Sequence, residues 1–236
     1  MGLSFGIKRL FSSYDKQNHS NKYIIAKTIL LFIGLSICAR VFMGICYSLL
    51  PSEMTNIVST NAETSTISGI KQFSLKAWVL VIVIGPFMEE TAFRLWLSMK
   101  KTHIAISLAF FLYYILGYVF KNTYQNQMTT AITCALLSLI VAMMFYYLVS
   151  EKILLYIKHN YTIYPFLVLC GCIIFSLSHL SNYVISSNVL LFGLISCLPQ
   201  LMGAISMSYL RINLGFMYGL IFHCIINTVS CYMITL

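Results

Sequence analysis

Long apolar runs constrain the fold of this chain more than any other feature. The first begins near Tyr23 and continues for more than twenty residues, and similar runs follow almost to the C-terminal end. About 20 apolar residues in an α-helix cross the hydrocarbon core of a bilayer. Lipid offers the backbone no hydrogen-bond partners, so a run of this kind crosses it as a helix. The sequence therefore predicts an all-α fold, a polytopic transmembrane helical bundle.

The composition agrees with that prediction and excludes other classes. Hydrophobic residues make up 59% of the chain, charged residues 9%, and the mean hydropathy is +0.85. A soluble domain carries about a quarter charged residues, so a soluble globular fold is excluded. The net charge of +9 is scattered along the chain. Nucleic acid is therefore not an expected partner, because phosphate binding needs a basic stripe, and the expected partner is the lipid bilayer.

About seven spanning segments can be read from the apolar runs, the third of them short and either tilted or partly re-entrant. Residues 1–22 form a basic cytoplasmic arm, and residues 23–236 form a single transmembrane helical domain. A polar loop covers residues 51–72. The predicted spans are residues 23–50, 74–97, 104–120, 130–149, 162–180, 189–209 and 214–235.

The basic residues of the short loops predict the orientation. With the N-terminus inside, the inner loops hold Lys100 and Lys101, then Lys152 and Lys158, then Arg211, and the outer loops hold fewer cations. Inner loops of membrane proteins carry the excess of Lys and Arg. We expect a cytoplasmic N-terminus and an outer C-terminus. The eight cysteines lie in or beside apolar runs, where thiols behave as small hydrophobes.

Two adjacent glutamates inside a predicted span are the most unusual residues of the chain. Glu89 and Glu90 are two of only six acidic residues, and Arg94 follows Glu90 by four positions. Charged side chains within a membrane are costly, face the bundle interior and mark functional sites. Residues four apart share a helix face, so Glu90 and Arg94 are expected to pair. Glu89 is left without a cation, which suits a general base.

Two histidines and an asparagine also lie in apolar segments. His179 follows Phe175 by four residues, and His223 precedes Asn227 by four. His223 and Asn227 therefore share a helix face and can point at one substrate atom. Either histidine taken alone is commonly an interhelical hydrogen-bonding group.

These residues allow three classes of function besides a purely structural charge cluster. An enzyme would use Glu89 as a base. A transporter would use the Glu89–Glu90 pair as a proton or cation site, and would then tolerate loss of Asn227. A catalytically silent binding or immunity protein would tolerate alanine at Glu89.

The three motifs in this order resemble a known family. Glu89-Glu90-Thr-Ala-Phe-Arg94, Phe175-Ser-Leu-Ser-His179 and His223-Cys-Ile-Ile-Asn227 are similar to the motifs of the CAAX-protease and bacteriocin-processing (CPBP) intramembrane peptidases. That family includes the type II CAAX prenyl endopeptidases. The first motif occurs by chance in roughly one such chain in five hundred, and the resemblance covers about residues 75–232.

The resemblance implies an intramembrane endopeptidase of a bacterial inner membrane, acting on a membrane-associated peptide or protein. Glu89 and His179 would activate a water, and His223 and Asn227 would donate to the oxyanion. Glu90, Arg94 and Phe175 would support these four residues. We expect no cofactor. The alternative is zinc held by His179, His223 and Glu89, and Asn is a poor ligand for that ion.

One feature departs from the family pattern. In many members the second motif follows the first by one helical hairpin, whereas here 90 positions separate Glu89 from His179, with two further apolar segments between them. Inserting two spans leaves the next helix starting from the same side of the membrane, so the predicted topology still closes.

Overall fold

Helices make up nearly all of the structure, a computed structural model that describes residues 11, 19–48, 74–120, 127–182 and 194–235. No β-strand occurs within those ranges, so the all-α prediction is confirmed. The predicted basic arm lies largely outside the described residues, and the loop at 51–72 lies wholly outside them. In chain order the elements are α3 (Asn21–Ser48), α6 (Leu75–Val79), η1 (Leu80–Ile84), α7 (Gly85–Arg94), η2 (Leu95–Ser98), α8 (Lys101–Phe120), α9 (Gln127–Leu148), α10 (Glu151–His159), α11 (Ile163–Ser178), η3 (His179–Asn182), α13 (Leu198–Leu214) and α14 (Phe216–Thr235).

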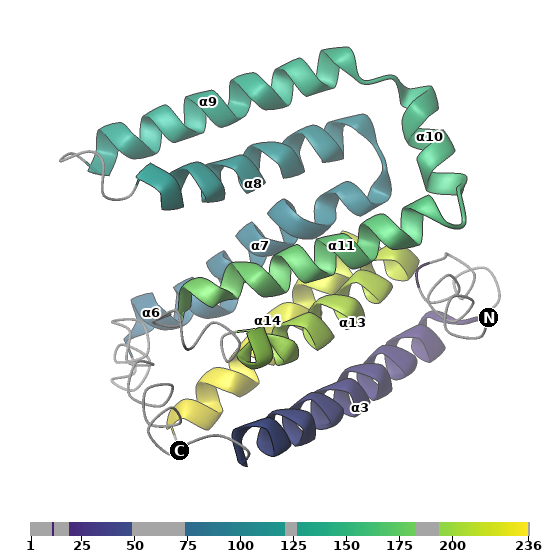
Figure 1. Ribbon diagram of the computed structural model, residues 1–236, viewed down its shortest axis with the longest axis vertical. Helices are drawn as coiled ribbons and strands as arrows, with labels where there is room; N and C mark the ends of the chain where they lie inside the picture. Colours follow the sequence, from purple (N-terminus) through teal and green to yellow (C-terminus); the bar gives the residue numbers. More distant parts are fainter. Residues whose placement is uncertain (1–10, 12–18, 49–73, 121–126, 183–193, 236) are drawn as a thin grey trace.

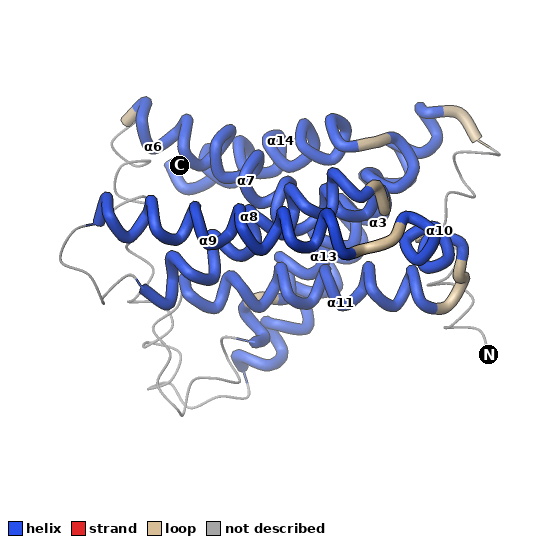
Figure 2. Tube along the Cα trace, turned by 90° about the horizontal axis from the view of Figure 1, so that it is seen from above, coloured by secondary structure: helices blue, strands red, loops and turns tan. Residues whose placement is uncertain are grey.

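Successive long helices run in alternating directions between two ends of the molecule (Figure 1). The start of α3, the turn between η2 and α8, the helix α10 and the turn between α13 and α14 lie at one end. The opposite end holds the last turns of α8 and α14 (Figures 1 and 2). The start of α3 and the end of α14 therefore lie at opposite ends of the bundle.

Several of the described helices are compatible with a multi-pass membrane protein. The helices α3, α8, α9 and α14 are long and apolar enough to cross a bilayer, and α10 with α11 makes a fifth span if that pair, bent by 91°, is counted as one. The predicted count of seven is not confirmed. The described residues of the other two predicted spans are largely helical. However, α13 has only 17 residues, and the segment from Leu75 to Ser98 is divided among α6, η1, α7 and η2.

Some predicted boundaries were wrong. The third span is not short, because α8 begins at Lys101 and runs for 20 residues. The span predicted to end at residue 209 continues to Leu214, so Arg211 lies inside α13, where it is buried. It is not in an inner loop. The predicted inner loop after α9 contains the helix α10, whose Ser150 cap accepts a hydrogen bond from the Lys152 backbone N–H.

The outer helices expose apolar side chains instead of covering them. Large hydrophobic residues are exposed along α3, α9 and α14, including Leu30, Leu139 and Val229. Soluble monomers rarely expose contiguous apolar patches of more than a few hundred Å². An apolar exterior of this kind suits contact with lipid.

The interior is built around α13, which packs against α3, α11 and α14. Small residues such as Ala204, Ser206 and Ser208 are buried along it, and small residues allow membrane helices to approach closely. A hydrophobic cluster formed by residues of α7, α11 and α13 includes Phe93 and Phe175. This cluster positions the segment that carries the two glutamates.

Candidate functional site

A proline interrupts the regular helix directly before the two glutamates. Pro86 has no N–H group to donate, and the turn before it is the π-helical segment η1, in which the Gly85 N–H donates to the Leu80 carbonyl. In the same register the Val81 carbonyl would face the Pro86 nitrogen, which has no hydrogen. Single π-turns inside α-helices often mark functional sites. Here the π-turn lies one turn before Glu89.

Glu90 lies at the centre of a buried polar cluster. Its side chain is 0% exposed, and its Oε1 accepts a hydrogen bond from Arg94 Nη1 within an ion pair. The predicted pairing of Glu90 with Arg94 is therefore confirmed. The same Oε1 lies 2.9 Å from His223 Nδ1. A carboxylate can only accept, so Nδ1 of His223 carries a proton that it donates to Glu90.

His223 joins the two glutamates. With Nδ1 directed at Glu90, its other nitrogen, Nε2, lies 3.6 Å from Oε2 of Glu89. A deprotonated Nε2 and an ionised carboxylate are both acceptors. Their approach is favourable when one of them holds a proton. His223 therefore bonds to Glu90 through one ring nitrogen and lies beside Glu89 with the other.

Glu89 and His179 face a common cleft, called here the glutamate cleft. Its volume is about 500 Å³, and its walls come from α7, α8 and α11. Glu89 is 25% exposed, in contrast to Glu90. His179 Nδ1 lies 2.9 Å from the Phe175 carbonyl, so it donates there and leaves Nε2 as the remaining ring nitrogen. The apolar part of the lining includes Phe111, Tyr114, Ile115, Tyr118, Ile174 and Leu177.

Phe175 contacts three members of the predicted site. The Arg94 guanidinium carbon lies 4.2 Å from its ring centroid. The rings of His179 and His223 meet it edge-on, with centroid distances of 4.7 Å and 6.3 Å. An aromatic ring stabilises a cation over its face. Phe175 thus stabilises the Arg94 guanidinium that pairs with Glu90, and its ring contacts both histidines.

Asn227 has a partner that the sequence did not predict. Its Nδ2 donates to the Val81 carbonyl over 2.9 Å, the carbonyl that Pro86 leaves without a backbone donor in the π register. The asparagine therefore fastens α14 to η1. An amide nitrogen carries two N–H groups, and Val81 takes one of them.

The structure brings some of the predicted site residues into contact and leaves others apart. Glu89, Glu90, Arg94 and His223 are in direct contact, and Glu89 shares the cleft with His179. Asn227 points at η1. The zinc alternative requires His179, His223 and Glu89 on one ion, and among the described residues no group of three His, Cys, Asp or Glu side chains is spaced to hold a metal. The arrangement does not fit that alternative, and the metal-free expectation stays a prediction.

Sequence reasoning missed the α8 wall of the cleft and the buried Arg211. Tyr114 and Tyr118 lie four apart and share a face with Phe111 and Ile115, a spacing that identifies one helix face. Arg211 Nη2 donates to the Leu95 carbonyl over 3.4 Å, at the end of the motif helix. The sequence signal that could have identified Arg211 as buried is its position as a cation inside a long apolar stretch.

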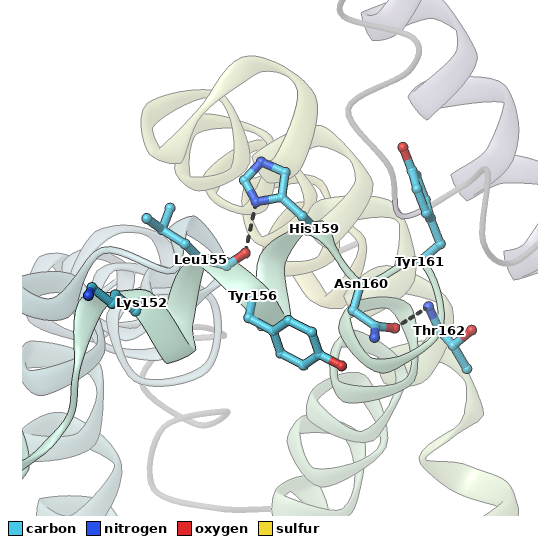
Figure 3. A pocket seen from close by; sticks show the side chains of 7 residues that line it. All are labelled: Lys152, Leu155, Tyr156, His159, Asn160, Tyr161 and Thr162. Carbon is cyan, nitrogen blue, oxygen red and sulfur yellow. Dashed lines mark hydrogen bonds between the residues drawn. The ribbon is translucent and has the colours of Figure 1, made fainter.

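A second hollow, of about 660 Å³, lies at the corner between α10 and α11. Its polar groups serve local helix structure (Figure 3). His159 Nδ1 lies 2.8 Å from the Leu155 carbonyl, and Asn160 Oδ1 accepts from the Thr162 and Ile163 backbone N–H groups at the start of α11. None of the motif residues lines it. The glutamate cleft is therefore the candidate functional site.

Comparison with known proteins adds no relative. No protein-family model, no curated protein and no solved structure matches this chain.

Proposed function

We propose that this protein is an intramembrane endopeptidase that hydrolyses a peptide bond of a membrane-associated protein or peptide. The observation that carries the proposal is the placement of Glu89. It is a partly accessible carboxylate that opens onto a cleft shared with His179, and it also lies beside His223. A base and a histidine facing one cavity supply what activation of a water requires.

In the proposed reaction a water lies between Glu89 and His179. Glu89 removes one proton while the water oxygen attacks the scissile carbonyl, with His179 Nε2 accepting the other water hydrogen. The carbonyl becomes a tetrahedral oxyanion. When the C–N bond breaks, the proton held by Glu89 passes to the leaving amine. The second water proton, which His179 Nε2 accepted, then passes to the amine, so the products are a carboxylate and an ammonium group, and the water supplies the added oxygen.

His223 is the proposed oxyanion donor. Glu90 accepts a hydrogen bond from the Nδ1–H of His223. This bond orients the ring and stabilises an imidazolium whose Nε2–H can donate. Developing negative charge in a water-poor site gains most from such fixed donors. Arg94 and Phe175 hold Glu90 in turn. The second N–H of Asn227 is a further proposed donor, and its bond to Val81 fixes where that donor lies.

Membership of the CPBP family is part of the proposal and rests on the three motifs. The helices between the first two motifs account for their long separation in the sequence. The intervening residues form α8, α9 and α10, and α8 supplies a wall of the glutamate cleft. The additional helices thus contribute to the cleft and do not separate Glu89 from His179.

The proposed membrane layout has seven crossings, with the N-terminus in the cytoplasm and the C-terminus outside, in a bacterial inner membrane. Alternating helix directions support it. Lys100 and Lys101 lie at the turn into α8, at the end of the bundle that also holds α10 with Lys152 and Lys158. Basic residues gathered at one end favour the cytoplasmic side for that end.

The test is substrate trapping. The Glu89→Gln variant keeps the shape of the side chain and loses its base, so it should retain membrane substrates that the unchanged protein cuts. Co-purified peptides are identified by mass spectrometry, and their cut sites are read after incubation with the unchanged protein in proteoliposomes. Glu151→Gln, an exposed glutamate on α10, is the matched control and should trap nothing. Equal capture by both variants, or capture without any cut by the unchanged protein, would contradict the proposal.

A further inference from the structure

A second hollow, called here the Trp96 pocket, adjoins the glutamate cleft. This pocket has a volume of about 320 Å³, and Phe93, Phe111 and Ile174 line both spaces. Trp96, Leu108 and Cys170 are among the residues that line only the second. The two hollows therefore lie next to each other along the motif helix, between α8 and α11.

The Trp96 pocket has fixed, apolar walls. The indole N–H of Trp96 donates to the Phe93 carbonyl over 2.7 Å, and the Ser107 hydroxyl donates to the Ala92 carbonyl over 2.6 Å. Both polar groups of the wall are thereby used within the protein. Gly171 lets the indole lie close to α11, since a Cβ there would be 3.0 Å from the ring. The space is left with apolar surface, typical of a pocket for an apolar group.

We infer that the Trp96 pocket receives one bulky apolar side chain of the polypeptide substrate, about three residues from the bond that is cut. The inference rests on the proposed function. Trp96 follows Glu89 by seven residues, a rise of about 10 Å along a helix at 1.5 Å per residue. An extended peptide covers that length in about three residues at roughly 3.3 Å each.

The position of the Trp96 pocket beside the glutamate cleft favours a peptide as the occupant. A chain whose scissile carbonyl lies between Glu89 and His179 has to leave the cleft on either side of that bond. The Trp96 pocket shares Phe93, Phe111 and Ile174 with the cleft, so it offers apolar space to a side chain that follows α7. Two hollows arranged in this way select a sequence with a large apolar residue at a set distance from the cut.

The first experiment measures cleavage specificity. Single-span peptides, varied at every position within five residues of the central bond, are reconstituted with the full-length protein, and the products are read by mass spectrometry. Leu, Ile, Met or Phe is expected about three residues from the cut. Cys170→Phe fills the pocket and should lower kcat/KM for those peptides at least tenfold relative to peptides with Ala there. Leu108→Ala enlarges the pocket and should shift the preference toward Trp. Cys38→Phe, on the exposed face of α3, should change neither.

The second experiment reads binding without turnover. A peptide with a photoreactive diazirine side chain at the same position is cross-linked to the Glu89→Gln variant, and the labelled residues are mapped. Labels are expected in α11 between Leu167 and Ile174, with loss of the label in Cys170→Phe. A photoreactive phospholipid is run in parallel.

The outcomes separate the two proposals. Cutting with no side-chain preference, or with a preference that Cys170→Phe leaves unchanged, overturns the pocket assignment and leaves the endopeptidase standing. Labelling of α11 by the phospholipid that the peptide does not displace overturns it too, because a lipid then fills the pocket. Absence of both cutting and peptide labelling overturns the pocket and the proposed function together.

Discussion

Glu89 and Glu90 are neighbours in the chain with different surroundings. Glu90 is enclosed by Arg94 and His223, whereas Glu89 reaches the cleft. A buried charge is tolerated because its partners compensate it, and removing one partner leaves the other exposed to the same low-dielectric surroundings. The two residues should therefore respond differently to the same substitution.

Glu89→Gln should lower turnover by about 10²–10⁴, the range for a lost general base, with little change in melting temperature. Glu90→Gln should instead destabilise the protein by about 3–5 kcal/mol, because Arg94 is left buried without its carboxylate. Changing Glu90 and Arg94 to Gln together should restore part of that stability. Thermal melts in detergent and a cleavage assay measure both effects. An active Glu89→Gln beside a stable, inactive Glu90→Gln would reverse the two roles.

Asn227 couples the third motif to the backbone of the first motif's segment. Asn227→Ala should lower the free energy of unfolding by about 1 kcal/mol, the lower end of the range for a carbonyl left without its donor, because the Asn227–Val81 bond is partly buried. Thr228→Ala is the matched control, since the Thr228 hydroxyl is exposed and bonds to the Cys224 carbonyl of its own helix. Denaturation of both variants in detergent measures the difference. Equal melting temperatures for the two would show that Val81 does not depend on Asn227.

At the scale of elements, the π-turn η1 determines where the glutamates point. A π-turn adds a residue to a helical turn, so it rotates the residues that follow relative to those that precede it. Gly85 stands at the end of this turn, where a Cβ would lie 3.1 Å from the Leu80 carbonyl oxygen. This close contact is with a backbone oxygen, which cannot move away as a flexible side chain could.

Gly85→Ala should therefore destabilise the protein by about 1–3 kcal/mol, as overpacking does, and should reduce turnover through displacement of Glu89 one turn later. Gly117→Ala on α8 is the control, because a Cβ at that position meets nothing within 4 Å. Replacing a helical glycine with alanine in open space stabilises by roughly 0.5–1 kcal/mol. Melting curves and turnover of the two variants provide the comparison. A neutral Gly85→Ala would mean that the π-turn is not retained in the membrane.

At the scale of the whole molecule, the described helices expose apolar side chains and bury three charged ones. The outer faces of α3, α9 and α14 carry exposed hydrophobic side chains, while Glu90, Arg94 and Arg211 are buried among α7, α11 and α13. That distribution is the one expected of a bundle surrounded by lipid. The alternating helix directions then decide on which side each loop lies.

A reporter enzyme fused after Leu236 should be active outside the cytoplasmic membrane, and one inserted between Met99 and His103 should be active inside. An insertion after His159, on the same end of the bundle (Figure 1), should report inside as well. Opposite readings are expected because the end of α14 and the turn between η2 and α8 lie at opposite ends of the bundle (Figure 1). Reports from the same side by the first two fusions would contradict seven crossings, and the segment from Leu75 to Ser98 would be the first to reconsider.

The sequence by itself determined the helical class and the residues worth following. Apolar runs leave a chain few alternatives to helices, because lipid cannot satisfy a free backbone. Charge inside such a run is rare enough to identify Glu89, Glu90 and Arg94. The spacing of four between Glu90 and Arg94 is a local property of a helix, so their ion pair could be predicted without knowledge of any other element.

Only the tertiary structure decided which groups meet across helices. That His223 contacts both glutamates, that Asn227 bonds to Val81 and that α8 walls the cleft all depend on how α7, α8, α11 and α14 pack. Sequence periodicity predicts which face of a helix is buried, but it does not predict which other helix packs against that face. The π-turn depends on both sequence and tertiary structure. Pro86 removes a backbone donor locally, and the Asn227 side chain on α14 supplies a donor to the Val81 carbonyl instead.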